Sequence, residues 1–411
     1  MTQTIKRLDS ELRVAPPSFR AAGPAGALLI GGDRTALGIA RSLGRQGIAV
    51  WVLADGPAVA TVSRYAQRTL AWPATAAEQL ACLISLAEQH GLYGWALFAH
   101  SDISSALIAQ HHEQLSEYYR LTTPPWEVLR WAYDKRLTYR IADDLGIGYP
   151  WTYYPDSARD LVTLERSFPL ILKPAIKQGY NQFTSAKAWR ADNRQELVMR
   201  YTEACALVDP ELVMVQDLIP GGGEVQFSYV ALCCDGQPLA SALARRARQY
   251  PIDFGHASTF VETIELPAIE APARLLLRAL RYTGLVELEF KLDARDGEYK
   301  LLDFNPRAWA WHSLCRAAGV DFPFLYWQLL HGEQLPELRA QPGVRWMHLS
   351  KDLLAVWQEL RRGRLRMGEY LGGFGTGLEW ALFASDDPTP SLVELPLALR
   401  TAWKRRNGTW H

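Results

Sequence analysis

The sequence predicts a mixed chain, in which an α/β domain is followed by an α+β part and then by a C-terminal extension of helices and loops. Between residue 27 and about residue 122, short apolar runs alternate with helical patterns, which predicts a parallel sheet covered by helices. Beyond Pro150 the apolar strands become denser and only two helical patterns interrupt them, an order typical of an α+β fold. After Gly332 the pattern changes again to helices and loops.

The apolar periodicity and the turn residues give the expected elements. In the first part, strands are expected at 27–31, 49–54 and 95–99, and helices at 35–46, 76–90 and 102–113. Thr123-Pro124-Pro125 marks a boundary, and one helix is expected over 126–145. In the second part, helices at about 193–207 and 269–282 separate strands at 169–173, 183–188, 212–218, 225–233, 237–244, 259–265, 285–293 and 299–305.

Composition excludes several classes of protein. The 411 residues carry 44 basic and 44 acidic side chains, and this balance favours neither nucleic acid nor an anionic membrane surface as a partner. The five cysteines are odd in number and show no CxxC spacing, which favours a reducing compartment over a disulfide framework or a cysteine metal site. The first residues lack the apolar core of a signal peptide, and no run approaches the roughly 18 apolar residues that span a bilayer. We expect a cytoplasmic protein without nucleic-acid or membrane partners.

The stretch at 27–56, ALLIGGDRTALGIARSLGRQGIAVWVLADG, has the order of a dinucleotide-binding unit: strand, glycine turn, helix, strand and acid. Its glycines lack the G-x-G-x-x-G spacing of that unit, however. Asp33 also puts a negative charge where a pyrophosphate approaches the helix N-terminus. We therefore do not expect a nicotinamide cofactor here.

Residues 284–309, GLVELEFKLDARDGEYKLLDFNPRAW, carry the strongest chemical signal. Read as two strands with a period of two, the segment puts Glu289 on a charged face, and Asp303 and Asn305 together on another. A three-residue loop with Gly297 in the left-handed region would place Glu289 opposite Asp303, with Cβ atoms about 5 Å apart. Two carboxylates and an amide form the oxygen-rich set that Mg²⁺ prefers, usually beside nucleotide phosphates. The alternative is an acidic hairpin on the surface.

Two weaker signals precede this hairpin. In FPLILKPAIKQGYNQFTSAKAW, 168–189, Lys173 ends an apolar strand before a polar loop and is suited to hold a phosphate. In LVMVQDLIPGGGEVQFSY, 212–229, an apolar strand runs into three consecutive glycines. A surface lysine and a flexible turn would explain these two features equally well.

Taken together and in this order, the three stretches resemble the ATP-grasp superfamily of carboxylate–amine and carboxylate–thiol ligases. The resemblance covers residues 27 to about 330, and the segments ELEF and LLDFNPR are its most specific part. It implies a pre-ATP-grasp domain followed by a two-lobed ATP-grasp fold. The implied division is a flexible arm at 1–26, the pre-ATP-grasp α/β domain at 27–124, the linker helix and lid lobe at 125–215, the C-terminal lobe with the metal site at 216–335, and the C-terminal extension at 336–411.

The resemblance also implies roles for individual residues. Glu289, Asp303 and Asn305 would bind Mg²⁺, and Arg307 would face the transferred phosphate or the acyl phosphate. Lys135 and Lys173 match the two phosphate-contacting lysines, and Arg248, or alternatively Arg245, would contact the γ-phosphate. The adenine hinge would be formed by Gln216, Asp217, Leu218 and Ile219, with Glu224 on the ribose.

The implied activity is ATP- and Mg²⁺-dependent joining of a carboxylate and an amine through an acyl phosphate. The loop at 31–38 would then border the carboxylate site together with Ser101 and Asp102, which otherwise simply cap a helix. The glycine start, SRY at 63–65 and DDPTP at 386–390 are most similar to the D-aspartate ligase-like branch. Two departures, a single glycine (Gly179) in the lid loop and the short Asp303, leave a non-catalytic nucleotide-binding protein open. A carbamoyl-phosphate-synthase-like enzyme also stays open, as does the oligomeric state, a homodimer included.

Overall fold

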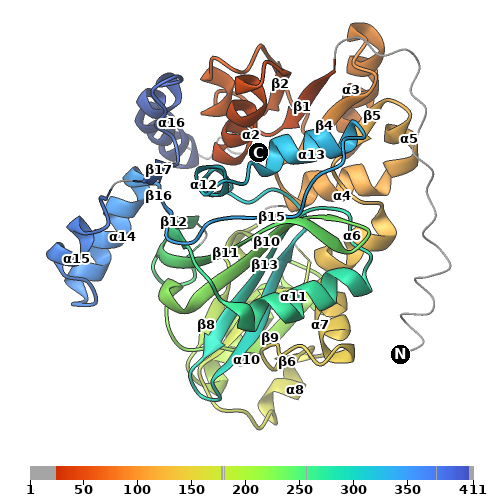
Figure 1. Cartoon of the computed structure of the whole chain (residues 1–411). Coiled ribbons are helices and arrows are strands. Elements are labelled where there is room, and N and C mark those ends of the chain that lie inside the picture. Colours follow the sequence, from red (N-terminus) through yellow and green to blue (C-terminus); the bar gives the residue numbers. More distant parts are fainter. Residues whose placement is uncertain (1–24, 177–178, 180, 256, 376, 407–411) are drawn as a thin grey trace.

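The computed structural model describes residues 25–406, except 177, 178, 180, 256 and 376. Three sheets organise the chain (Figure 1), with five, four and eight strands. The predicted flexible arm at 1–26 lies almost wholly outside the described residues. No helix in the described part of the chain is long and apolar enough to cross a membrane.

The N-terminal sheet is parallel throughout, with strand order β3-β2-β1-β4-β5. Its elements are β1 (Gly26–Ile30), α2 (Arg34–Arg45), β2 (Ala49–Ala54), β3 (Arg68–Ala71), α3 (Ala76–His90), β4 (Trp95–Ala99), α4 (Asp102–Gln110), α5 (His112–Ser116) and β5 (Tyr119–Leu121). The strand order reverses between β1 and β4, and such a reversal leaves a crevice at the carboxyl ends of the strands. The loops after these two strands, which begin at Gly31 and His100, therefore face the same crevice.

The second sheet is antiparallel, with order β6-β9-β7-β8. Its strands and helices are β6 (Thr152–Tyr153), α8 (Ala158–Val162), β7 (Leu170–Pro174), α9 (Gln182–Ser185), β8 (Trp189–Ala191), α10 (Arg194–Cys205) and β9 (Val213–Asp217). The predicted strand at 183–188 is wrong, because Asn181 accepts hydrogen bonds from the amides of Phe183 and Thr184 and so starts the short helix α9.

The third sheet has the strand order β14-β13-β10-β11-β12-β16-β17, and β15 pairs with β11. Its elements are β10 (Gln226–Cys234), β11 (Gln237–Tyr250), β12 (Ala257–Thr263), α11 (Pro267–Ala279), β13 (Gly284–Asp293), β14 (Glu298–Asn305), α12 (Ser313–Ala317), α13 (Phe322–Leu330), β15 (Leu338–Arg339), β16 (Arg345–Met347) and β17 (Leu378–Trp380). Three of these strands, β15 to β17, lie in the extension that we expected to contain only helices and loops. The extension therefore completes the sheet.

The predicted helix at 126–145 is two helices, α6 (Trp126–Tyr133) and α7 (Lys135–Asp144). Asp134 separates them, because its extended backbone breaks the first helix and its carboxylate accepts the amide hydrogen of Arg136 to start the second. Together with α11, both helices cover the apolar face of β10 and β13, where Leu288 and Phe290 are buried.

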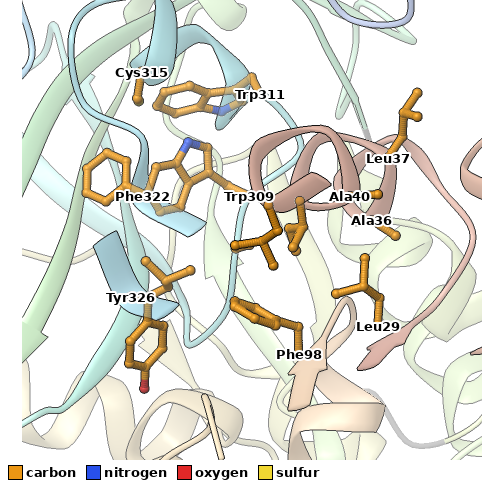
Figure 2. Packing of buried hydrophobic residues seen from close by; sticks show 14 of the residues in the cluster. Leu29, Ala36, Leu37, Ala40, Phe98, Trp309, Trp311, Cys315, Phe322 and Tyr326 are labelled. Atoms are coloured by element: carbon orange, nitrogen blue, oxygen red, sulfur yellow. The ribbon is translucent and has the colours of Figure 1, made fainter. Parts of the chain in front are cut away.

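One hydrophobic core joins the N-terminal sheet to the third sheet (Figure 2). Side chains of β1, α2 and β4 pack there against the segment that follows β14. The labelled members are Leu29, Ala36, Leu37, Ala40, Phe98, Trp309, Trp311, Cys315, Phe322 and Tyr326. Because this core is shared, the crevice of the first sheet is held against the polar face of the third.

The C-terminal extension also contains α14 (Leu349–Arg361), α15 (Met367–Leu371) and α16 (Thr389–Arg406), and it is fastened to the N-terminal domain by two aspartates. Asp387 is 1% exposed and accepts hydrogen bonds from the side chains of Arg41 and Ser63 and from the Arg64 amide. Asp386 accepts from both Arg45 and the Tyr65 hydroxyl. The motifs SRY and DDPTP, far apart in sequence, thus form one contact, which we call the clamp.

Replacing Asp387 with alanine should lower the free energy of unfolding by about 3–5 kcal/mol, because it leaves the buried Arg41 guanidinium without its carboxylate. Urea unfolding at neutral pH measures the change. Asp55→Ala is the control, since Asp55 is an exposed aspartate of the same domain. A loss no larger than that of the control would mean that the clamp contributes nothing to stability.

Candidate functional site

Glu289 of β13 and Asp303 of β14 are direct cross-strand partners, as we predicted, and Glu287 pairs in the same way with Asn305. The predicted conformation of Gly297 is confirmed, but the predicted loop length is wrong. Gly297 has φ +76°, but the loop has four residues, 294–297, since Asp293 pairs with Glu298. A β-bulge at Leu302 takes up the extra residue and restores the pairing.

The carboxylate of Glu289 is buried among positive charges. Its Oε2 lies 3.1 Å from a guanidinium nitrogen of Arg246 and 3.6 Å from Nζ of Lys187, and its Oε1 accepts a hydrogen bond from Asn305. Burial alone would raise the pKa of Glu289, but the charges of Arg246 and Lys187 outweigh it and lower the pKa to about 2. Glu289 is therefore an anion at any physiological pH.

Glu287 lies beside this anion on the same face of β13. It accepts hydrogen bonds from the Ser228 hydroxyl at 3.0 Å and from the Asn305 amide at 3.2 Å. Burial, reinforced by the negative charge of Glu289, raises the pKa of Glu287 to about 7. The two glutamates thus differ strongly in their affinity for a proton because different charges surround them.

Lys135, at the start of α7, forms an ion pair with Asp303 of the third sheet, and its backbone amide donates to the carbonyl of Ala175, just after β7 of the second sheet. Burial lowers the pKa of Lys135, but the nearby Asp303 more than compensates and raises it above its usual range. One turn along α7, the Tyr139 hydroxyl donates to the carbonyl of Leu302 and accepts from the Gln216 amide. Helix α7 therefore fixes the metal-candidate hairpin relative to the predicted hinge.

The other residues predicted to contact nucleotide lie on the second sheet and on the segment after it. Lys173 is buried in β7, opposite Met214 of β9. Part of the predicted lid loop after it, residues 177, 178 and 180, lies outside the described residues. Asp217 ends β9 and is held by two hydrogen bonds from Arg166.

Lys291 supports the segment after β9, which carries the predicted Leu218 and Ile219. Its ammonium group donates to the carbonyls of Ile219 at 2.9 Å and Gly221 at 2.7 Å. Burial lowers the pKa of Lys291 to about 8, although Glu224 acts in the opposite direction. Glu224 itself accepts the amide hydrogen of Gly222, so its carboxylate stays beside the glycine turn.

The prediction for Arg248 needs correction, because this side chain does not reach the hairpin. A β-bulge between Arg246 and Arg248 turns Arg248 to the other face of β11, where it makes two hydrogen bonds to the buried Asp352. The alternative, Arg245, pairs with Glu262. The guanidinium that β11 contributes to the site is that of Arg246. No local sequence pattern indicates the bulge.

Arg307, just after β14, reaches the crevice of the N-terminal sheet. Its Nε donates to Asp102 at 2.7 Å, at the start of α4. Ser101 is the N-cap of that helix and accepts the Ser104 amide hydrogen. Across the crevice, Asp33 caps α2 by accepting from the amides of Thr35 and Ala36. The predicted acyl-phosphate arginine and the predicted acid site therefore adjoin.

His100 is a residue of this crevice that the sequence analysis missed. A side chain at Gly31, which has φ +110°, would bring its Cβ within 2.2 Å of the imidazole, so glycine is required for the ring to lie there. Nδ1 of His100 is buried and has no hydrogen-bond partner among the described residues. The sequence feature that could have indicated His100 is its position, directly after a strand and directly before the helix N-cap Ser101. Lys187 and Arg246 were missed as well, because both depend on contacts across the fold: Lys187 lies 14 residues beyond Lys173 in the same quoted segment, and Arg246 directly follows Arg245.

The hairpin residues suit a divalent cation. Oε2 of Glu289 is buried and accepts no hydrogen bond of good geometry from the described residues, and the set contains carboxylate and amide oxygens. Within the described ranges, however, no three His, Cys, Asp or Glu side chains are arranged to hold an ion by themselves. A cation at Glu289, Asp303 and Asn305 would need further oxygen ligands, as phosphates supply.

Replacing Lys291 with methionine should loosen the segment at 218–226, because it removes two charge-assisted hydrogen bonds. Such bonds contribute about 1.5–3 kcal/mol, so amide hydrogen exchange there should become about 10- to 100-fold faster. Lys300→Met is the control, since Lys300 pairs with Asp293 and Asp296 at the hairpin loop instead. Unchanged exchange in 218–226 would show that Lys291 does not hold this segment.

Comparison with models of known protein families gives no match. The chain is similar to a D-aspartate ligase of Enterococcus faecium, 27% identical over 231 residues, and spans about half of that protein's length (53%) and 52% of its own. Its structure is similar to an L-amino acid ligase from Bacillus licheniformis, with TM-score 0.59, 16% identity and 77% and 76% of the two chains covered. It also resembles an ADP complex of N5-carboxyaminoimidazole ribonucleotide synthetase, with TM-score 0.62, 14% identity and 84% and 87% covered. The chain therefore has the ATP-grasp fold, as its resemblance to that superfamily predicted.

Proposed function

We propose that this protein is a ligase that joins a carboxylate to an amine, with ATP hydrolysed to ADP and phosphate. The observation that carries the proposal is the contact between Arg307 and Asp102. It brings Arg307, which we expect to face the transferred phosphate, to the crevice where open α/β sheets bind ligands. The relatives named D-aspartate ligase and L-amino acid ligase support an amino acid as the acid or the amine.

The nucleotide would lie between the second and third sheets. Lys135 and Lys173 would contact its phosphates, the backbone of Gln216, Asp217, Leu218 and Ile219 its adenine, and Glu224 its ribose. Glu289, Asp303 and Asn305 would hold Mg²⁺, which when bound supplies charge neutralisation at the phosphates. The ADP complex of a protein with this fold supports the use of a nucleotide.

The proposed reaction takes the acyl-phosphate route that the family resemblance implies, and the charges around the hairpin support it. A carboxylate oxygen attacks the γ-phosphorus, the bond to the β-phosphate oxygen breaks, and ADP leaves. The amine nitrogen then attacks the acyl carbon, the bond between that carbon and the phosphate oxygen breaks, and the departing phosphate takes up the proton that the nitrogen loses as the amide forms. Arg246 and Arg307 stabilise the negative charge that develops on the transferred group, so the protein contributes position and electrostatics.

The crevice residues would recognise the acid. Arg307 would hold the carboxylate to be activated, and Asp33 and Asp102 are suited to an ammonium group on the same molecule. Nδ1 of His100, buried and without a hydrogen-bond partner in the described part of the chain, offers one further hydrogen bond. These groups together favour an amino acid over a simple fatty or keto acid as the substrate to be phosphorylated.

The purified protein should release ADP and phosphate only when ATP, Mg²⁺ and a suitable carboxylate are all present. A screen of amino acids as acids, crossed with amines, measures this. Hydroxylamine in place of the amine should give a hydroxamate of the same acid, because it intercepts the activated carboxyl. AMP and pyrophosphate as products would contradict the acyl-phosphate route. Nucleotide binding without turnover on any acid would favour a binding protein.

Arg246 and Arg248 offer a matched test of the site, since they lie two residues apart on one strand. Arg246→Met and Arg307→Ala should each lower kcat by about 10²–10³, the loss seen when one charge-stabilising donor is removed, with smaller effects on ATP binding. Arg248→Met should lower stability through its buried pair with Asp352 and leave kcat per folded molecule unchanged. If Arg248→Met lowered kcat and Arg246→Met did not, Arg248 would be the arginine that contacts the γ-phosphate.

A further inference from the structure

A cavity of about 250 Å³ lies where α2, α12 and the segment from β17 to the clamp meet (Figure 1). It is separate from the crevice, since Asp33, His100, Asp102 and Arg307 are not among the described residues that line it. Drug-sized ligands occupy pockets of about 300–1,000 Å³. The cavity is therefore suited to a smaller molecule.

One face of α2 forms a wall of the cavity through Gly38, Arg41, Ser42 and Arg45. These positions recur at the three- and four-residue spacing of a single helical face. His312 lies opposite, and a Cβ at position 38 would come within 2.6 Å of its ring. Glycine at this position therefore lets the imidazole lie against the helix, and the two residues together close this side of the cavity.

The arginines of this wall already have carboxylate partners. Arg45 makes two hydrogen bonds to Asp386, and Arg41 donates to the buried Asp387. The clamp thus compensates the charges of both guanidinium groups. The charged groups of the lining that the clamp does not engage are Arg316, Asp321 and Glu379.

These three groups are only partly paired. A guanidinium nitrogen of Arg316 lies 3.6 Å from Oε1 of Glu379, which is too long for a hydrogen bond. Asp321 accepts a hydrogen bond from the Ser42 hydroxyl at 2.6 Å but forms no ion pair within the described part of the chain. Burial raises the pKa of Glu379, although three nearby arginines act in the opposite direction. Two carboxylates and one guanidinium therefore keep bonding capacity toward the cavity.

We infer that this cavity binds a free α-amino acid, at a site separate from the crevice. The ammonium group of the ligand contacts Glu379 and Asp321, and its carboxylate pairs with Arg316. A simple anion would meet two carboxylates, and a simple amine would draw Glu379 away from Arg316 without replacing its charge. Trp380 and Phe383, which also line the cavity, offer an apolar surface to the side chain of the ligand. The inference does not rest on the proposed reaction, because no crevice residue takes part.

Calorimetry on the Arg307→Ala variant tests this with the crevice impaired. Titrated with each of the common amino acids in the absence of nucleotide, this variant should bind at least one of them, with one molecule per chain. Two analogues of that amino acid, one without its carboxylate and one without its ammonium group, should bind at least about tenfold more weakly. Each of them lacks one charge-assisted interaction.

Glu379→Gln and Arg316→Met, each added to Arg307→Ala, should lower the affinity at least about tenfold, because each removes one charge that the ligand pairs with. The matched controls are Glu270→Gln and Arg274→Met, which alter an ion pair on α11. Arg274 is 33% exposed and Arg316 is 36% exposed, so the two arginine changes are comparable. The control proteins should bind as Arg307→Ala alone does, and circular dichroism checks the folding of all the variants.

Ser385→Trp keeps the test decisive if the charged variants do not fold. Ser385 is exposed and lines the cavity, so a tryptophan there fills the space without removing a charge and should abolish binding. The inference is overturned if no amino acid binds Arg307→Ala, or if cavity and control variants bind alike. It is also overturned if an analogue with one charged group binds as tightly as the amino acid. A failed ligase assay would leave these results unaffected, since no nucleotide is used.

Discussion

The carboxylate of Glu289 is a buried charge on β13, next to the edge strand of the third sheet, and its surroundings hold it ionised. An unpaired carboxylate at this depth would take up a proton, since burial disfavours the anion. Arg246 from β11, Lys187 from the turn between α9 and β8, and Asn305 from β14 prevent this by converging on it. Each comes from a different part of the chain. The positions of the sheets relative to one another are thus tied to one electrostatic requirement.

Alternation along the strands determines which residues can meet that requirement. A strand turns successive side chains to opposite faces, so a single inserted residue changes the membership of the site. Two bulges in the third sheet have opposite effects. The bulge at Leu302 brings Asp303 opposite Glu289, whereas the bulge after Arg246 sends Arg248 to the far face. The same device therefore builds the site at one strand and anchors the extension at another.

These bulges also explain which features could be predicted from the sequence and which could not. The alternation of α and β elements, the polar face of the hairpin and the left-handed Gly297 all follow from local patterns, and the structure agrees with them. Local patterns do not predict the loop length, the face of Arg248 or the contact of Arg246 with Glu289. Each depends on a bulge, and a bulge depends on pairing with a neighbouring strand. His100 was missed for a related reason. Its place beside Gly31 depends on the order of β1 and β4 in the sheet, which no local pattern contains.

The clamp has a consequence for how the chain is made. Arg41 and Asp387 are 346 residues apart, yet each is the other's buried ionic partner. At translation rates of about 5–20 residues per second, roughly 20–70 s separate their emergence from the ribosome. Until residue 387 has been made, the Arg41 guanidinium lacks the carboxylate that it pairs with in the folded chain. The contact that fastens the first domain to the extension can therefore form only late in synthesis.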